Sequence, residues 1–214
     1  MRNDWEKQWF FRRKEAADFA QEKFDDSAWE CVDLPHDWAI RGPFSPENDP
    51  DITIVDAAND ITWNFVHPGR SGGLPHVGKG FYRKKFTLGQ ELPGHLRVEF
   101  DGIMANSKIY CNGVYAGGRP YGYSSFMADL TKLVHPGENV LAVEAENYPQ
   151  ASRWYPGGGI YRHTRLICAG RAHIAYHGVR ITTNQNHVRI SVKLENADGE
   201  KVFLQAHVHD PSHR

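Results

Sequence analysis

The sequence predicts an all-β protein: an antiparallel β-sandwich followed by the first strands of a second, immunoglobulin-like sandwich. Short apolar runs recur between turn residues, at the spacing of about 8–12 residues that is typical of sandwiches. Only residues 14–23 (KEAADFAQEK) suit a short helical turn, and an exposed loop fits that segment equally well. Hydrophobic residues make up 40% of the 214 positions, which is enough to fill a core.

The first sandwich is predicted from runs that alternate in polarity or lead into strong turns. Residues 96–101 (LRVEFD) and 139–146 (NVLAVEAE) alternate apolar and polar side chains, which indicates half-buried strands. Asn112-Gly113 lies between two further runs and is a strong signal of a type I′ hairpin. The predicted strands of this sandwich are residues 81–86, 96–101, 107–111, 114–115, 139–146 and 161–167.

The run 81–86 (FYRKKF) has aromatic and basic residues on both of its faces. Alternation places Phe81 and Arg83 on one face and Tyr82 and Lys84 on the other. We expect one of these faces to be solvated.

The chain changes character after Ala169-Gly170. Three evenly spaced strands are predicted at about 175–182, 188–195 and 202–209, and the last two are joined by a loop that ends in Gly199. An immunoglobulin-like sandwich needs about seven strands, so we expect this second domain to be truncated and the chain to be a fragment of a longer protein. The predicted domains are residues 1–171 and 172–214.

Residues 41–79 resist assignment to strands and are predicted to form a long irregular segment. Loops longer than about 12–15 residues are uncommon and are usually functional or disordered. This one contains Trp63, Asn64 and Phe65, and aromatic residues are not typical of disorder.

Residues 152–162 (SRWYPGGGIYR) are predicted to form a loop of unusual shape, because proline and consecutive glycines suit neither a buried strand nor a helix. Glycines without Cβ atoms let the backbone turn sharply and approach another surface. Trp154 and Tyr155 supply rigid contact area. Arg153 supplies five fixed donors, which match carboxylates or sugar hydroxyls.

Six segments together resemble the amino-terminal domain of family 2 glycoside hydrolases, over about residues 5–170. DLPHDW in the first segment is similar to the β-galactosidase branch. The segments are VDLPHDWAI (32–40), GKGFYRKKF (78–86), YCNGVYAGG (110–118), YGYSSFMADLT (121–131), GENVLAVEAEN (137–147) and SRWYPGGGIYR (152–162). The resemblance implies a jelly-roll, galactose-binding-like domain. An immunoglobulin-like domain and a (β/α)8 barrel that carries both catalytic glutamates would follow it.

The resemblance also implies which residues support substrate binding, whereas no catalytic residue is expected in this chain. In the family, the loop that corresponds to residues 152–162 lies where the first domain meets the barrel, at the edge of the active site. Some β-galactosidases have an aspartate two residues before the tryptophan, where this chain has Ser152. Bracing the barrel and touching the sugar both remain open as roles for Ser152, Arg153 and Trp154. Asn64 is the candidate for a family asparagine in a long loop.

Other motif residues have structural or mixed interpretations. Asp33 and Asp37 are predicted to accept backbone N–H groups in turns, and His36 to be a hydrogen-bonding residue of the core or a loop. Tyr121 and its neighbours Tyr123 and Phe126 either pack over an open end of the sandwich or offer an aromatic face to a sugar.

Charge and composition exclude several classes of function. With 25 basic and 26 acidic residues, the chain lacks the basic excess typical of nucleic-acid binding. No run approaches the length of a membrane span, and the polar start is unlike a signal peptide. The protein is therefore either cytoplasmic or exported after loss of a signal. We expect no cofactor and no metal, even though His207 and His209 share one face, and we leave a homo-oligomer open.

The three cysteines, Cys31, Cys111 and Cys168, share no metal-ligand spacing and are interpreted as small buried thiols.

The predicted function is that of a non-catalytic N-terminal part of a retaining β-glycosidase, with β-galactosides as the carbohydrate partner. Two alternatives remain: a free-standing carbohydrate-binding module, and an interaction domain that binds a protein through its aromatic loops.

Overall fold

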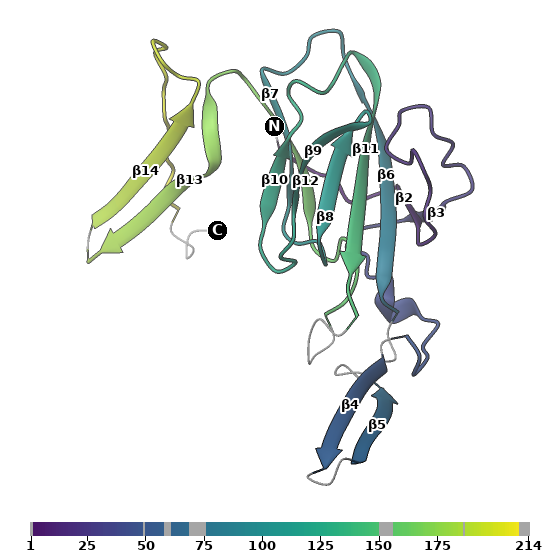
Figure 1. Cartoon of the computed structure of the whole chain (residues 1–214). Helices are drawn as coiled ribbons and strands as arrows, with labels where there is room; N and C mark the ends of the chain where they lie inside the picture. The colour runs from purple at the N-terminus through teal and green to yellow at the C-terminus, as the bar shows by residue number, and fades with distance from the viewer. Residues whose placement is uncertain are drawn as a thin grey trace. The chain divides into compact units, whose positions relative to one another are not determined.

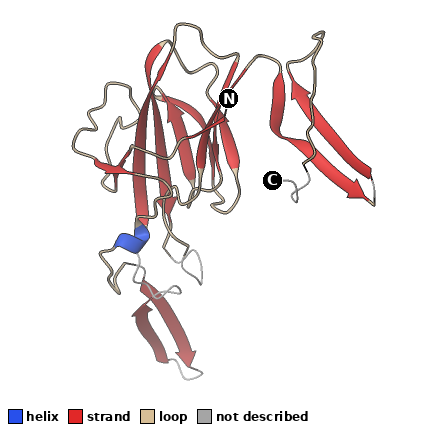
Figure 2. Cartoon of the chain, turned by 180° about the vertical axis from the view of Figure 1, so that it is seen from behind, coloured by secondary structure: helices blue, strands red, loops and turns tan. Residues whose placement is uncertain are grey.

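The computed structural model describes residues 2–48, 50–57, 61–68, 76–149, 156–185 and 187–209. At residues 2–4, 50–57 and 61–68 the description is limited to the backbone. Strands dominate the described residues, and the one helical element among them is a short 3₁₀ turn at Ala39–Arg41 (Figure 2). The all-β class predicted from the sequence is confirmed.

Two sheets form the main body as a jelly-roll sandwich (Figure 1). One sheet has four strands in the order β1-β12-β7-β10, and the other has six in the order β3-β2-β6-β11-β8-β9. The strands of these sheets are β1 (Arg2–Asp4), β2 (Trp9–Arg12), β3 (Glu30–Val32), β6 (Gly78–Leu88), β7 (His95–Phe100), β8 (Ser107–Cys111), β9 (Val114–Arg119), β10 (Phe126–Asp129), β11 (Gly137–Asn147) and β12 (Thr164–Ala169).

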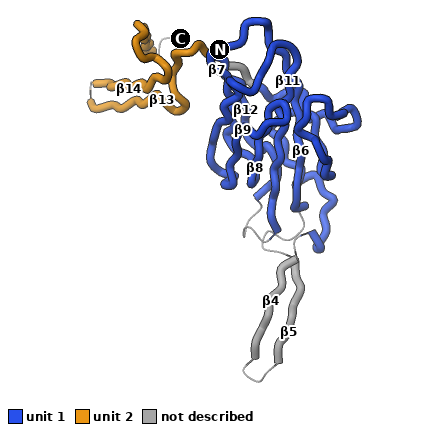
Figure 3. The backbone as a smooth tube through the Cα atoms, turned by 45° about the horizontal axis from the view of Figure 1, so that its top comes forward, with its two compact units in different colours: residues 1–168 blue, residues 169–214 orange. Residues whose placement is uncertain are grey.

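The chain divides into two compact units, residues 1–168 and 169–214 (Figure 3). The second unit holds β13 (His173–Asn184) and β14 (His187–Glu195), which pair as an antiparallel hairpin. The predicted domain boundary between residues 171 and 172 stays a prediction and lies close to this division.

The sandwich core comes from the alternation that the sequence predicts, with side chains from both sheets. Leu141 and Val143 of β11 pack with Val98 and Phe100 of β7, and all four are fully buried. Trp9 of β2 belongs to the same cluster. Such burial of large apolar side chains is the main favourable term that holds the two sheets together.

The outer face of β6 and β11 is also largely buried. Among residues 81–86 only Lys85 is exposed, so the expectation that one whole face of this run is solvated is not met. Residues 13–29 run over this face in turns and irregular structure, not as a helix. Phe19 and Trp29 from this segment form a second apolar cluster with Phe81 and Ala142. Arg83 is fully buried in the same layer, where its Nε donates to Asp26 Oδ2 at 2.8 Å. The guanidinium also donates to three backbone carbonyl oxygens of the covering segment, at Phe19, Gln21 and Phe24.

Three further expectations need correction. The segment 41–79 is not irregular throughout, because β4 (Pro50–Ala57) and β5 (Ile61–Pro68) form an antiparallel hairpin within it. Residues 202–209 form no strand and are exposed, and the described strand pairs of the second unit are those between β13 and β14. Cys31 is exposed, because it lies on the edge strand β3 and only Val32 of that strand is buried.

Candidate functional site

The glycine segment at residues 157–159 is a buried strap inside the first domain. Its backbone lies against residues 36–38 on one side, where Trp38 N donates to Gly158 O at 3.0 Å. On the other side, Met104 and Gly159 exchange two backbone hydrogen bonds of 2.8 and 2.7 Å. Residues 36–38 of the DLPHDW motif and residues 157–159 of the glycine motif, far apart in the sequence, therefore meet in one hydrogen-bonded junction.

The close approach in this junction requires glycine, as the sequence predicts. A Cβ atom on Gly158 would lie 2.7 Å from the nearest atom of the Trp38 ring, and one on Gly159 would lie 2.8 Å from His36 O and also overlap the Tyr82 hydroxyl. Gly159 has φ +111°, a backbone conformation that side chains with a Cβ rarely adopt.

The DLPHDW residues behave as the sequence predicts. Asp37 Oδ1 accepts the backbone N–H groups of Ala39 and Gly158, each at 2.9 Å, and Asp33 Oδ1 accepts that of Gln8 at 3.0 Å. His36 is buried, and its Nδ1 lies 2.9 Å from the Tyr82 hydroxyl. Burial lowers the pKa of His36 to about 4, so the imidazole is neutral at physiological pH.

A pocket of about 350 Å³ lies next to this junction, where β11 ends. Its lining includes Met104, Asn106, Tyr121, Tyr123, Asn147 and Tyr148, and Pro156 borders it just before the glycine strap. Figure 1 shows this end of β11, marked by its arrowhead, at the lower end of the sandwich. The pocket thus joins the turn after β9, the segment before β8 and the end of β11.

The two asparagines of the pocket are held in place by backbone carbonyl groups. Asn106 Nδ2 donates to Glu146 O at 3.2 Å, and Asn147 Nδ2 donates to Gly157 O at 2.8 Å. Each amide therefore has a fixed orientation before any ligand binds.

The aromatic residues named from the sequence divide between the two roles considered for them. Phe126 is buried and stacks on Phe100 with ring centroids 5.4 Å apart, so it is a core residue. Tyr121 and Tyr123 are 62% and 40% exposed, and both line the pocket.

The described lining of the pocket offers aromatic rings, hydroxyl groups and amides, which suit binding. None of the described lining residues is a carboxylate, and a retaining glycosidase needs two carboxylic acids. Within the described ranges, no group of His, Cys, Asp and Glu side chains could hold a metal ion. In the same part of the chain, no helix is long and apolar enough to cross a membrane.

The residues predicted to support substrate binding are only partly covered by the structure. Ser152, Arg153 and Trp154 lie outside the described residues. Asn64 lies on β5, where its backbone pairs with Ile54, and its side chain is not described. Sequence reasoning missed Asn147 and the adjacent Tyr148, although an Asn-Tyr-Pro end to an alternating strand could have marked them.

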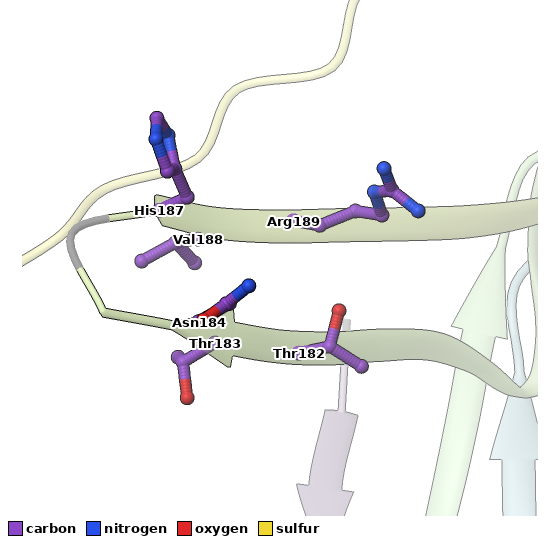
Figure 4. A pocket seen from close by; sticks show the side chains of 6 residues that line it. All are labelled: Thr182, Thr183, Asn184, His187, Val188 and Arg189. Carbon is purple, nitrogen blue, oxygen red and sulfur yellow. The ribbon is translucent and has the colours of Figure 1, made fainter.

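A larger hollow of about 600 Å³ lies at the tip of the β13–β14 hairpin. Its lining residues are all exposed, and Figure 4 shows His187 and Thr183 pointing in opposite directions from the two strands. Because these side chains do not converge, the hollow is not a candidate site.

Comparison with known proteins agrees with the sandwich fold. Residues 4–169 match the family described as "Glycosyl hydrolases family 2, sugar binding domain". Over 186 residues the chain is 41% identical to the β-galactosidase BoGH2A of Bacteroides ovatus, which covers 86% of this chain and 20% of that protein. It is 33% identical over 177 residues to a putative β-glucuronidase of Formosa agariphila, covering 82% of this chain and 15% of the relative.

Solved structures share the fold. A family 2 glycosyl hydrolase from Bacteroides cellulosilyticus superposes with a TM-score of 0.74 at 32% identity, over 91% of this chain and 24% of that one. A β-glycosidase from Bacteroides vulgatus gives 0.72 at 29% identity, with the same 91% and 24% coverage. The fold and the family match place residues 4–169 in the class of sugar-binding-type sandwich domains of glycosyl hydrolases. The chain belongs to glycosyl hydrolase family 2, and it spans about a fifth of the length of the curated relatives it matches.

Proposed function

We propose that this chain is the N-terminal, non-catalytic part of a longer retaining β-glycosidase that hydrolyses terminal β-galactosides. The observation that carries the proposal is the 41% identity to a β-galactosidase over 86% of the chain. A β-glucuronidase is the main competing activity among the relatives, at a lower identity of 33%. The DLPHDW segment, which is similar to the β-galactosidase branch, also favours the galactoside.

The catalytic carboxylic acids belong to a barrel domain in this proposal. Since none of the described pocket residues is a carboxylate, the first domain acts by shaping and closing the substrate site rather than by proton transfer. Asn64, Ser152, Arg153 and Trp154 are the residues proposed to reach the substrate or to brace the barrel beside it.

The second unit supports a longer protein in a different way. Val179 and Ile181 of β13 pair across the hairpin with Val192 and Ile190 of β14, so these apolar side chains form a ladder on one face. Val179, Ile181 and Ile190 are 48%, 61% and 39% exposed. An exposed apolar sheet face of this kind needs a second layer, which further strands of an immunoglobulin-like domain would supply.

The test is the specificity of the complete gene product. We expect its kcat/KM for 4-nitrophenyl β-D-galactoside to exceed that for the corresponding β-D-glucuronide. A higher value for the glucuronide would reverse the assignment. No hydrolysis of either substrate would instead favour a free-standing carbohydrate-binding module.

A further inference from the structure

Three tyrosine rings border the pocket at the end of β11. Tyr121, Tyr123 and Tyr148 are 62%, 40% and 50% exposed. Clusters of exposed aromatic side chains mark binding sites on soluble proteins, since they have large contact area and few rotatable bonds. We infer that this pocket binds one neutral hexopyranoside ring directly, an inference that rests on the proposed function and adds a sugar site within this chain.

The arrangement of the rings suits a pyranose. One face of a pyranoside presents C–H groups, which are attracted to the negatively polarised face of an aromatic ring. The centroids of Tyr121 and Tyr123 lie 5.5 Å apart, and the ring planes are tilted by 58°. The two rings therefore do not cover each other's faces, as parallel stacked rings would.

The turn that carries Tyr121 and Tyr123 is held in place by hydrogen bonds from Tyr161 and Asn106. Tyr161 OH donates to Gly122 O at 3.1 Å, and Asn106 N donates to Pro120 O at 3.0 Å. A Cβ atom on Gly122 would lie 2.6 Å from Met104 Sδ, so the turn packs directly on the pocket floor. A site built in this way loses little conformational freedom when a ligand binds.

The polar groups of the pocket select for a neutral ligand. The amides of Asn106 and Asn147, already oriented by the backbone carbonyls they donate to, and the tyrosine hydroxyls can exchange hydrogen bonds with sugar hydroxyls. None of the described lining residues carries a charge. Among the described lining residues, a uronate carboxylate would therefore find no cationic partner to offset the hydration that it loses.

The volume limits the size of the ligand. At about 350 Å³, the pocket lies near the lower end of the range of about 300–1,000 Å³ for small-molecule sites. One sugar ring fits this space better than an extended oligosaccharide.

The experiment is a titration of the ¹⁵N-labelled chain with methyl β-D-galactopyranoside and methyl β-D-glucuronide, followed by the backbone amide shifts of Asn106 and Gly122. We expect saturable shifts with the galactopyranoside, with a Kd on the order of 1 mM for a ligand of this size. We expect the glucuronide to bind at least 5-fold more weakly. Tyr121→Ala should weaken galactopyranoside binding at least 5-fold, whereas Tyr121→Phe, which keeps the ring, should weaken it less.

Tyr115→Ala is the matched control, because Tyr115 is 59% exposed on β9 and does not line the pocket. It should leave the Kd unchanged. The inference is overturned if no saturable shift occurs at Asn106 and Gly122, or if the glucuronide binds as tightly as the galactopyranoside. It is also overturned if Tyr121→Ala and Tyr115→Ala have the same Kd for the galactopyranoside. A pocket that serves only as a docking face for another domain would give the first of these results. Since this assay measures binding to the chain and not hydrolysis by the complete protein, its failure is distinct from failure of the proposed function.

Discussion

Alanine substitutions at four glycines should separate two physical reasons why the strap at residues 157–159 needs glycine. Gly158 has a Trp38 ring atom 2.7 Å from the position of an added Cβ but no unusual φ, whereas Gly137 has φ +93° and open space around it. Gly159 combines φ +111° with crowding by His36 and Tyr82, and Gly89 has neither feature. The set therefore tests steric crowding and backbone strain independently.

The expected losses follow from these two terms. Crowding against a packed core costs about 1–3 kcal/mol, which is the loss in unfolding free energy expected for Gly158→Ala. Trp38 is 1% exposed and belongs to the buried core cluster. Backbone strain costs about 1–2 kcal/mol, the value expected for Gly137→Ala. Gly159→Ala should lose both terms, about 2–5 kcal/mol, and Gly89→Ala should stay within about 0.5 kcal/mol of the original chain.

Thermal unfolding of the four variants measures the order directly. For a chain of this length, about 1 kcal/mol corresponds to a Tm shift of about 2–4 °C, so Gly159→Ala should lower the Tm by roughly 4–20 °C. Gly159→Ala, which combines crowding and strain, should lose the most stability and Gly89→Ala the least. Gly158→Ala and Gly137→Ala should lie between them. If Gly158→Ala and Gly159→Ala have the same Tm as Gly89→Ala, the strap is not packed against Trp38 and the description of the junction is wrong.

Three further predictions concern charge and activity. Burial holds the pKa of His36 at about 4, below its ordinary 6.5, so between these pH values the unfolded chain binds a proton that the folded chain does not. The free energy of unfolding should therefore fall by about 3 kcal/mol as the pH drops from 6.5 to 4. Denaturant unfolding of His36→Gln, measured over the same pH range, should lack this loss. Asp26→Asn leaves the buried Arg83 guanidinium without its carboxylate and should cost about 3–5 kcal/mol in urea unfolding, whereas Asp33→Asn, at the exposed Lys7 pair, should change little. The purified chain alone should not hydrolyse 4-nitrophenyl β-galactoside above background, and turnover that co-purifies with it would contradict a catalytic centre outside this chain.

Short sequence patterns predicted the turns and strands whose conformation depends on neighbouring residues in the sequence. Asn112 and Gly113 both have positive φ, 51° and 82°, as the type I′ hairpin between β8 and β9 requires. The alternation at 139–146 located β11, but it did not reveal that the polar-looking face is covered by residues 13–29. That covering includes the Arg83–Asp26 pair, whose members are 57 residues apart and share no local pattern.

The candidate site was predictable only in part for a similar reason. Tyr121 and Tyr123 stood out because aromatic residues in a glycine-containing turn are unusual. Asn106 and Asn147 did not, because the pocket is formed by the ends of different strands that meet only after folding. The glycine strap was recognised as a close-approach segment, yet its contact surface, Trp38, could be identified only from the structure.

The most direct test of the central claim is the effect of Arg153→Ala on the complete enzyme and on this chain. If the first domain supports the substrate site through this loop, kcat/KM of the complete enzyme should fall by about 5- to 150-fold, the equivalent of about 1–3 kcal/mol for partners left unpaired at a buried junction. The free energy of unfolding of this chain should change by no more than about 0.5 kcal/mol. A strongly destabilised chain together with unchanged kinetics of the complete enzyme would show that Arg153 serves the fold, and would contradict the account.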